Sequence, residues 1–161
     1  MLKKSPLTVN LLAIIFCIFS MPAMAQGLHS LTVITEKGNE VAFSIEDLDQ
    51  LDQSGFKTTT IWTEGVVDFT GVALSEILKA AGVEGSSFEL IALNDYAITL
   101  TLSDLEDNQP LIATRQNGEL MSIREKGPFW MVYPFDSDRK YQTEVIYARS
   151  IWQLNRISAM E

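Results

Sequence analysis

The chain has 161 residues, of which 12 are Lys or Arg and 21 are Asp or Glu, so its formal net charge at pH 7 is −9. An acidic protein of this kind repels phosphate backbones and anionic membrane surfaces, which argues against nucleic acid as a partner. The only cysteine, Cys17, and the only histidine, His29, both lie near the N-terminus. Nucleophilic or metal chemistry that needs thiolate or imidazole therefore has few residues to use.

The first 25 residues have the pattern of a secretory signal peptide. Two lysines precede an apolar run over 11–19, and residues 21–25 (MPAMA) supply a small-x-small cleavage site. The apolar run is shorter than the roughly 20 residues that a membrane span needs. Cleavage after Ala25 predicts a periplasmic or secreted single domain over 26–161, with no stable membrane anchor. Loss of the two lysines would change its charge to −9 − 2 = −11.

The first elements expected in this domain are a β-hairpin and a short helix. Segments 31–35 and 41–45 are rich in β-forming residues and flank a turn that contains Gly38. A Ser-x-x-Asp capping pair and apolar residues at helical spacing predict a helix over 45–53, which Gly55 would end.

A strand, a loop and a longer helix are expected next. Residues 57–62 are largely β-branched and predict a strand, followed by a turn over 63–65 where Gly65 allows a ligand to approach the backbone. A helix is predicted over 74–81, with Gly82 as its left-handed cap. The apolar stripe assigned to it consists of Phe69, Val72, Leu74, Ile77 and Leu78.

The C-terminal half is predicted to be mainly β-structure. Strands are expected over 88–93, 97–102, 110–114 and 119–123. Turn-forming residues at 94–96 and at 117–118 separate these pairs, and Ser103 can cap a short helical turn. These elements predict a mixed α/β domain that is rich in β-structure, with short helices and a largely antiparallel sheet.

The stretch 126–157 ends this domain. The apolar run 129–133 predicts a buried strand, and a polar loop leads from it to a second extended segment that carries Arg149, Trp152 and Arg156. Two strands that face a shared site are the natural interpretation.

Few residues outside this stretch suggest chemistry. We interpret His29 as a surface residue rather than a catalytic one or a metal ligand. Acidic clusters near 47–52, 104–107 and 136–138 lack the Gly and Glu positions of a calcium loop and are interpreted as solvated surface.

Basic residues and tryptophans leave two interpretations open. Five cations lie in or beside the C-terminal strands, where they could bind an anionic ligand or pair with the many carboxylates. These are Arg115, Arg124, Lys126, Arg149 and Arg156. The three tryptophans could be packing residues with bonded indole N–H groups, or they could line one aromatic pocket. They are Trp62, Trp130 and Trp152.

Several segments between 57 and 157 resemble the molybdopterin-binding domain of the sulfite oxidase-type molybdenum oxidoreductases. The segments are WTEG at 62–65, FTGVAL at 69–74, AAG at 80–82, LNDY at 93–96, LIATRQNGEL at 111–120, GPFWMVYP at 127–134 and ARSIWQLNRI at 148–157. The resemblance implies a compact, β-rich fold with short helices. In that family the fold holds a pterin-bound molybdenum.

The resemblance fails at the residues that the family's chemistry uses. The metal-binding Cys of the family falls on Trp62, and soft thiolate suits molybdenum better than most side chains do. Trp130 stands where family members often carry an Arg, and Ile151-Trp152 stand near an expected Lys. Arg149 and Ser150 match the family. These departures argue against a working molybdenum enzyme, although the resemblance still allows molybdopterin as the cofactor.

Three functions follow as hypotheses. The first is a non-catalytic protein that binds a small anionic or aromatic ligand, or a segment of a partner, in the former cofactor pocket. The second is a molybdopterin-dependent oxidoreductase without a Cys ligand. The third is a periplasmic adaptor that uses its acidic surface to contact a periplasmic or membrane-protein partner. The residues assigned to the candidate pocket are Trp62, Thr63, Gly65, Trp130, Arg149, Ser150 and Trp152.

Overall fold

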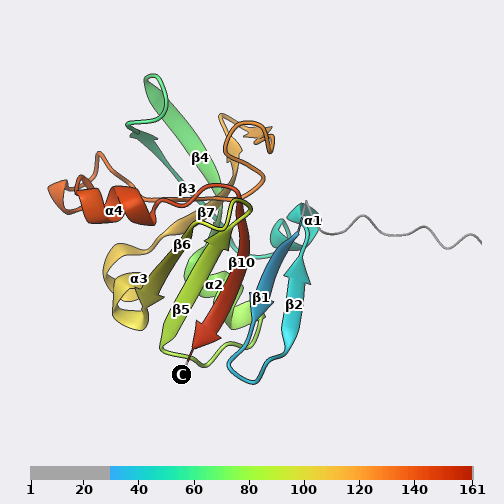
Figure 1. Ribbon diagram of the computed structural model, residues 1–161. Helices are drawn as coiled ribbons and strands as arrows, with labels where there is room; N and C mark the ends of the chain where they lie inside the picture. The colour runs from blue at the N-terminus through green and yellow to red at the C-terminus, as the bar shows by residue number, and fades with distance from the viewer. Residues whose placement is uncertain (1–29, 161) are drawn as a thin grey trace, which may run out of the picture.

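The computed structural model of the protein describes residues 30–160 (Figure 1). The expected signal peptide, Cys17 and His29 lie outside the described residues. Within the described part of the chain, no helix is long and apolar enough to cross a membrane.

Two β-sheets form the domain. The first sheet has the strand order β2-β1-β10-β5-β6, in which only the β1–β10 pairing is parallel. Its strands are β1 (Leu31–Ile34), β2 (Glu40–Phe43), β5 (Ser87–Ala92), β6 (Ala97–Thr101) and β10 (Leu154–Met160). The second sheet has the order β3-β4-β7-β8, and β9 also pairs with β7. Its strands are β3 (Gln53–Thr59), β4 (Val66–Ala73), β7 (Leu111–Gln116), β8 (Glu119–Leu120) and β9 (Trp130–Val132).

Short helices connect the strands. They are α1 (Ile45–Leu48), α2 (Leu74–Ala80), α3 (Leu102–Asn108), the 3-10 turn η1 (Arg139–Tyr141) and α4 (Glu144–Arg149). Figure 1 shows α2 behind the first sheet, while the β3–β4 hairpin extends beyond the end of that sheet. The β-rich fold with short helices and mainly antiparallel sheets confirms the predicted fold class.

Two strands of the second sheet, β7 and β9, are buried on both faces. Along β7, Ile112 packs in the large core shared with the first sheet and α2, whereas Leu111 and Ala113 pack in a smaller cluster on the opposite face. The side chains of β9 alternate in the same way, since Met131 packs in the core and Trp130 packs in the smaller cluster. Successive side chains of a strand point to opposite faces, so this alternation places Trp130 on the face that leads to the site described below.

Many elements lie where the sequence predicted them. The 45–48 helix begins with a capping box in which Ser44 and Asp47 bond each other's backbone N–H groups. Asn117 and Gly118 have φ values of 50° and 85°, which is the backbone of a tight hairpin turn between β7 and β8. The pair β5–β6 and helix α2 also confirm their predictions.

Three boundaries between 45 and 62 were predicted wrongly. The first helix ends at Leu48 rather than near residue 53, and β3 begins at Gln53 and ends at Thr59 rather than at Trp62. Gly55 does not end a helix but lies within β3, where a Cβ atom would stand 2.6 Å from the Phe69 carbonyl oxygen. Close pairing with β4 explains this glycine better than a helix terminus does.

Strand β4 was not predicted. Phe69 and Val72 were assigned to the apolar stripe of the following helix, but both lie in β4, and only Leu74, Ile77 and Leu78 belong to α2. The segment from Val66 alternates between exposed and buried positions up to Phe69, as strands do. A bulge then shifts the β4–β7 register between Thr70 and Gly71 and interrupts the alternation.

The stretch 126–157 contains two strands, as expected, but they lie in different sheets and the second begins later than predicted. β9 belongs to the second sheet and β10 to the first, and Arg149 ends helix α4 instead of lying in an extended segment. The returning strand expected over 119–123 is also shorter, since β8 ends at Leu120.

Candidate functional site

A cavity of about 400 Å³ lies where the two sheets meet α4. Its volume falls in the range of about 300–1,000 Å³ that is typical of small-molecule sites. The lining residues come from the loop after β3, the β5–β6 turn, α4 and the connection from α4 to β10. They are Trp62, Ala92, Asn94, Tyr96, Tyr147, Ala148, Ser150, Ile151 and Trp152.

Trp62 is the centre of the aromatic side chains at this cavity. Its ring centroid lies 5.8 Å from those of Trp130, Tyr147 and Trp152, and 6.1 Å from that of Phe135. The angles between its ring plane and the other four range from 64° to 89°, so all four pairs have the edge-to-face geometry that aromatic rings favour. These contacts hold Trp62 in place although it is partly exposed.

The loop that carries Trp62 is fixed by threonine side chains. The Trp62 backbone N–H donates to the Thr60 hydroxyl at 3.0 Å, and the Thr60 and Thr63 hydroxyls lie 2.8 Å apart. Just before the loop, the Thr59 backbone N–H and hydroxyl both donate to the Asp136 carboxylate, at 2.6 and 2.7 Å. These bonds lower the pKa of Asp136 and join the end of β3 to the segment after β9.

Trp130 packs against Trp62 and is fully buried. Its indole N–H donates to the Ser150 carbonyl oxygen at 3.1 Å, and its ring packs against Phe69 with centroids 5.3 Å apart. The Ser150 hydroxyl in turn donates to the Ile146 carbonyl oxygen of α4 at 2.8 Å. Trp130 is therefore a packing residue that anchors the end of α4 to β9.

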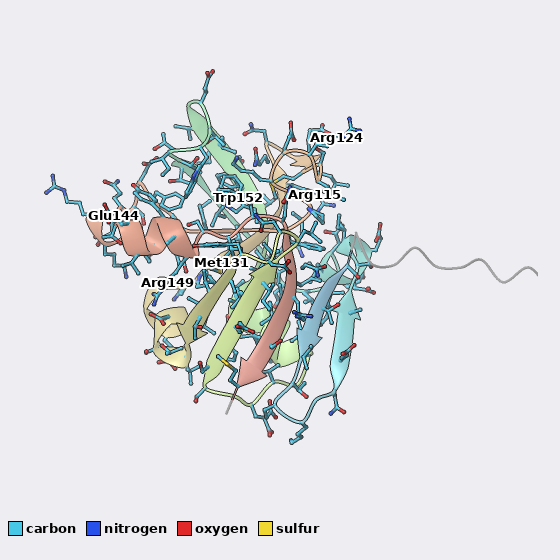
Figure 2. The ribbon with its side chains drawn as sticks, viewed as in Figure 1. Arg115, Arg124, Met131, Glu144, Arg149 and Trp152 are labelled. Carbon is cyan, nitrogen blue, oxygen red and sulfur yellow. The ribbon has the colours of Figure 1, made fainter. Side chains whose placement is uncertain are left out.

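Backbone hydrogen bonds position the connection from α4 to β10. The Met131 N–H donates to the Ile151 carbonyl oxygen at 2.8 Å, and the Leu93 N–H donates to that of Gln153 at 2.9 Å. Gln153 has a φ of 52°, and its side-chain amide donates to the Ile123 carbonyl oxygen at 2.7 Å. Trp152 is thus held at the junction of the two sheets (Figure 2).

The β5–β6 turn supplies the outer rim. The Tyr96 hydroxyl donates to the Ala148 carbonyl oxygen at 2.9 Å, which closes the turn against α4 although Tyr96 is 46% exposed. The Tyr96 backbone N–H also donates to the side-chain oxygen of Asn94 at 3.2 Å. Asp95, between these two lining residues, is exposed and has a positive φ of 64°.

None of the described residues that line the cavity has a charged side chain. Arg149 at the end of α4 donates to Asp104 of α3 at 2.7 Å, and Figure 2 shows it beside α3. Burial favours the neutral form of Asp104, but hydrogen bonds from Thr101 and Arg149 outweigh it and leave the pKa of Asp104 below its usual value. The charge of Arg149 is therefore matched by a carboxylate.

Comparison with known proteins places this fold in a family. The sequence matches the family described as "Oxidoreductase molybdopterin binding domain" over residues 19–137. The chain belongs to this family. No curated protein matches it. Among solved structures, the fold is similar to the sulfane dehydrogenase SoxCD from Paracoccus pantotrophus, with a TM-score of 0.62 and 16% sequence identity. That match covers 84% of this chain but only 39% of the other, so the molybdopterin-binding domain described here spans about two fifths of that protein's length.

The side chains at the cavity of this molybdopterin-binding domain do not suit a pterin-bound molybdenum. Within the described part of the chain, the lining offers no thiolate, imidazole or carboxylate to the metal and no Lys or Arg to an anionic phosphate group. Across residues 30–160, no three His, Cys, Asp or Glu side chains are grouped so as to hold a metal ion. Trp130 instead packs against Trp62, which in turn packs against Trp152.

The structure brings together some of the predicted site residues. Trp62, Ser150 and Trp152 line the cavity, and Trp130 contacts Trp62 from below. Thr63 supports the loop through Thr60 but is not part of the lining, and Gly65, with a φ of 66°, lies in the turn before β4. Arg149 points to Asp104 rather than lining the cavity.

The five basic residues that suggested an anion site are dispersed. Arg115 makes a two-pronged pair with Asp49 at 2.7 and 2.8 Å, which lowers the pKa of Asp49. The ion-pairing interpretation is thus confirmed for Arg115 and Arg149. Lys126 lies over the rings of Trp130 and Trp152, and Arg124 and Arg156 are exposed.

Six lining residues were missed as site residues, and three of these have polar or aromatic side chains, namely Asn94, Tyr96 and Tyr147. A signal existed for the first two, since LNDY at 93–96 was one of the segments that carried the family resemblance. Tyr147 gave no comparable signal, because the segment around it was expected to be a loop and then extended backbone.

Proposed function

We propose that this domain is a non-catalytic binding protein that holds a small ligand in the aromatic cavity. The observation that carries this proposal is the composition of the lining, in which Trp62, Tyr96, Tyr147 and Trp152 surround a space without a charged side chain. Aromatic walls with a few polar groups are the usual composition of small-molecule sites. The ligand class is an organic molecule or a partner's side chain that can pack against aromatic rings.

The polar groups at the cavity can orient such a ligand. No described residue accepts a hydrogen bond from the indole N–H of Trp62 or Trp152, whereas that of Trp130 is bonded to Ser150. Asn94 adds a side-chain amide at the rim. Two indole donors and one amide give direction to binding while the rings provide the contact area.

The lining favours this function over a molybdenum oxidoreductase. In the cavity an aromatic ring stands where the family resemblance places the metal-binding thiolate, and the arginine expected to face an anion is bound to Asp104. An oxidoreductase of this family would have to hold its cofactor with neither group. We further propose that the domain acts in the periplasm, on the basis of the signal-like N-terminal sequence.

Tryptophan fluorescence can test this proposal, because two tryptophans line the cavity. The mature protein would be titrated with a low-molecular-weight periplasmic extract and with free pterin, and its molybdenum content would be measured after purification from molybdenum-replete cells. We expect a saturable fluorescence change that Trp62→Ala removes and that Leu120→Ala, a change at an exposed residue of β8, leaves intact. One molybdenum per chain would contradict the proposal.

A further inference from the structure

The geometry of the cavity points to a specific ligand chemistry. We infer that the aromatic cavity selects an organic cation whose charge is a methylated ammonium group, an inference that rests on the binding function proposed above. Four features of the site carry it: the ring angles, the absence of cations from the lining, an unpaired acid at the rim, and an ammonium group already bound by the same aromatic cluster.

The rings around the cavity meet at steep angles. Trp62 makes an angle of 89° with Tyr147 and 73° with Trp152. A flat aromatic ligand binds best between parallel rings, but none of the ring contacts between lining residues is stacked. Walls that are nearly perpendicular enclose a compact group on several sides, as in the aromatic cages that bind quaternary ammonium ions.

The electrostatic surroundings favour a cation over an anion. Arg149 is paired with Asp104, and no Lys or Arg is among the lining residues. The whole chain carries a formal charge of −9, which attracts cations from solution. An anionic ligand would enter this cavity without a cationic partner, which is costly in an apolar site.

Asp95 adds a local negative charge. It lies between Asn94 and Tyr96, which both line the cavity, and its side chain is exposed. Within residues 30–160 its carboxylate makes no ion pair and accepts no hydrogen bond. This acid can attract a cation to the rim without being neutralised by the protein.

The aromatic cluster already holds one ammonium group. The Lys126 Nζ lies 5.1 Å from the ring centroid of Trp152 and 5.4 Å from that of Trp130, within the distance at which cation–π attraction acts. Lys126 is not a lining residue, so the cavity remains free for a second cation. The attraction of this cluster for an ammonium group is therefore visible within the fold.

Matched pairs of cationic and neutral probes test this inference. Choline and 3,3-dimethylbutan-1-ol have the same shape and differ in charge, and acetylcholine and 3,3-dimethylbutyl acetate form a larger pair for the same cavity. Each would be titrated calorimetrically into the mature protein. We expect the cation of at least one pair to bind about tenfold or more tightly than its neutral counterpart, because cation–π attraction strengthens in a desolvated site.

Variants show whether the binding takes place at this cavity. Trp152→Leu should remove the preference for the cation. Phe56→Leu, which changes an aromatic residue that packs on the same cluster but does not line the cavity, should retain it. Asp95→Asn should weaken binding of the cation about two- to threefold at low salt and leave the neutral probe unchanged. Lys126→Gln should strengthen binding of the cation, because it removes a like charge beside Trp152.

The outcomes separate this inference from the function on which it rests. Equal affinity for the two members of both pairs would overturn the selection of cations but support a binding cavity. Failure of all four probes to bind would also overturn the inference, and the fluorescence titration with periplasmic extract would then decide the proposed function independently. Preference for a cation that persists in Trp152→Leu would place the binding elsewhere and overturn it as well.

Discussion

The two faces of the second sheet have different roles. On one face Met131 and Ile112 join a core with the first sheet and α2. On the other, Trp130 and Phe69 form a smaller cluster on which Trp62 and Trp152 of the cavity pack. The same strands, β7 and β9, supply both faces. Successive side chains of a strand point to opposite faces of the sheet. One residue of a strand can thus belong to the stable scaffold while its neighbour in the sequence supports a binding site.

The difference between the two faces lies in what covers them. The first sheet and α2 pack against the core, whereas the loop after β3 and the connection from α4 to β10 supply the Trp62 and Trp152 that pack on the aromatic face. Loops vary more freely than the elements that they connect, so a fold can keep its scaffold while its site changes. Trp62 and Trp152 lie on such loops, and Trp130 lies on the scaffold.

The largest expected effect is at Trp130, on the aromatic face of β9. Trp130→Ala would leave a cavity beneath Trp62 and free the Ser150 carbonyl oxygen, so we expect it to lower the free energy of unfolding by about 3–5 kcal/mol. Urea denaturation measures this loss. Trp130→Phe should recover part of it, and a loss below about 1 kcal/mol in Trp130→Ala would show that Trp130 does not anchor the site.

A change at Trp62 should separate binding from stability. Because Trp62 is partly exposed, we expect Trp62→Ala to lower the free energy of unfolding by only about 1–2 kcal/mol. The same variant should lose ligand-dependent fluorescence change. Urea denaturation and titration of the same sample would check both, and a variant that binds normally would disprove the role of Trp62 as a wall of the cavity.

The ion pair beside the site gives a pH dependence. The pKa of Asp104 in the fold lies below its unfolded value of about 3.9, so its stabilisation is present above that pH and is lost as the pH falls through the folded value. We expect Asp104→Asn to cost about 1 kcal/mol near pH 7, with the difference from the wild type vanishing toward pH 2.

Asp49→Asn provides the matched control for this pH dependence. Asp49 pairs with Arg115 outside the cavity and also has a lowered pKa, so it should show the same loss with acidity. Only Asp104→Asn should affect ligand binding, because it frees Arg149 at the end of α4. A difference between Asp104→Asn and the wild type that stays constant from pH 7 to pH 2 would contradict this account of the pair.

The smallest effect is expected at the rim. Tyr96→Phe removes the hydrogen bond to the Ala148 carbonyl oxygen but keeps the ring, so it should cost no more than about 0.5–1 kcal/mol. Hydrogen exchange of the α4 amides should be faster in this variant. A loss of ligand binding as large as that of Trp62→Ala would mean that the hydroxyl itself contacts the ligand.

The sequence predicted the scaffold better than the site. Hairpin turns at Gly38 and at Asn117-Gly118, the capping box at Ser44 and the left-handed Gly82 that follows α2 are local signals, and each one formed as expected. Strand β4 was missed because its alternation breaks at the Gly71 bulge and passes without a turn into α2. Local patterns fail where pairing with a distant strand decides the structure.

The cavity could be predicted only in part. Aromatic residues and family resemblance identified Trp62, Ser150 and Trp152, but not the rim formed by Asn94 and Tyr96. The three tryptophans have different roles, and only the fold distinguishes the bonded, buried Trp130 from the two that line the cavity. The pairing of Arg149 with Asp104 spans 45 residues and has no local signal.

Native mass spectrometry of the mature protein, isolated without denaturation from molybdenum-replete cells, tests the central claim most directly. The account predicts a chain that carries an organic ligand and no molybdenum, and a Trp62→Ala chain of bare mass. A wild-type chain that carries one molybdenum with its pterin would contradict it.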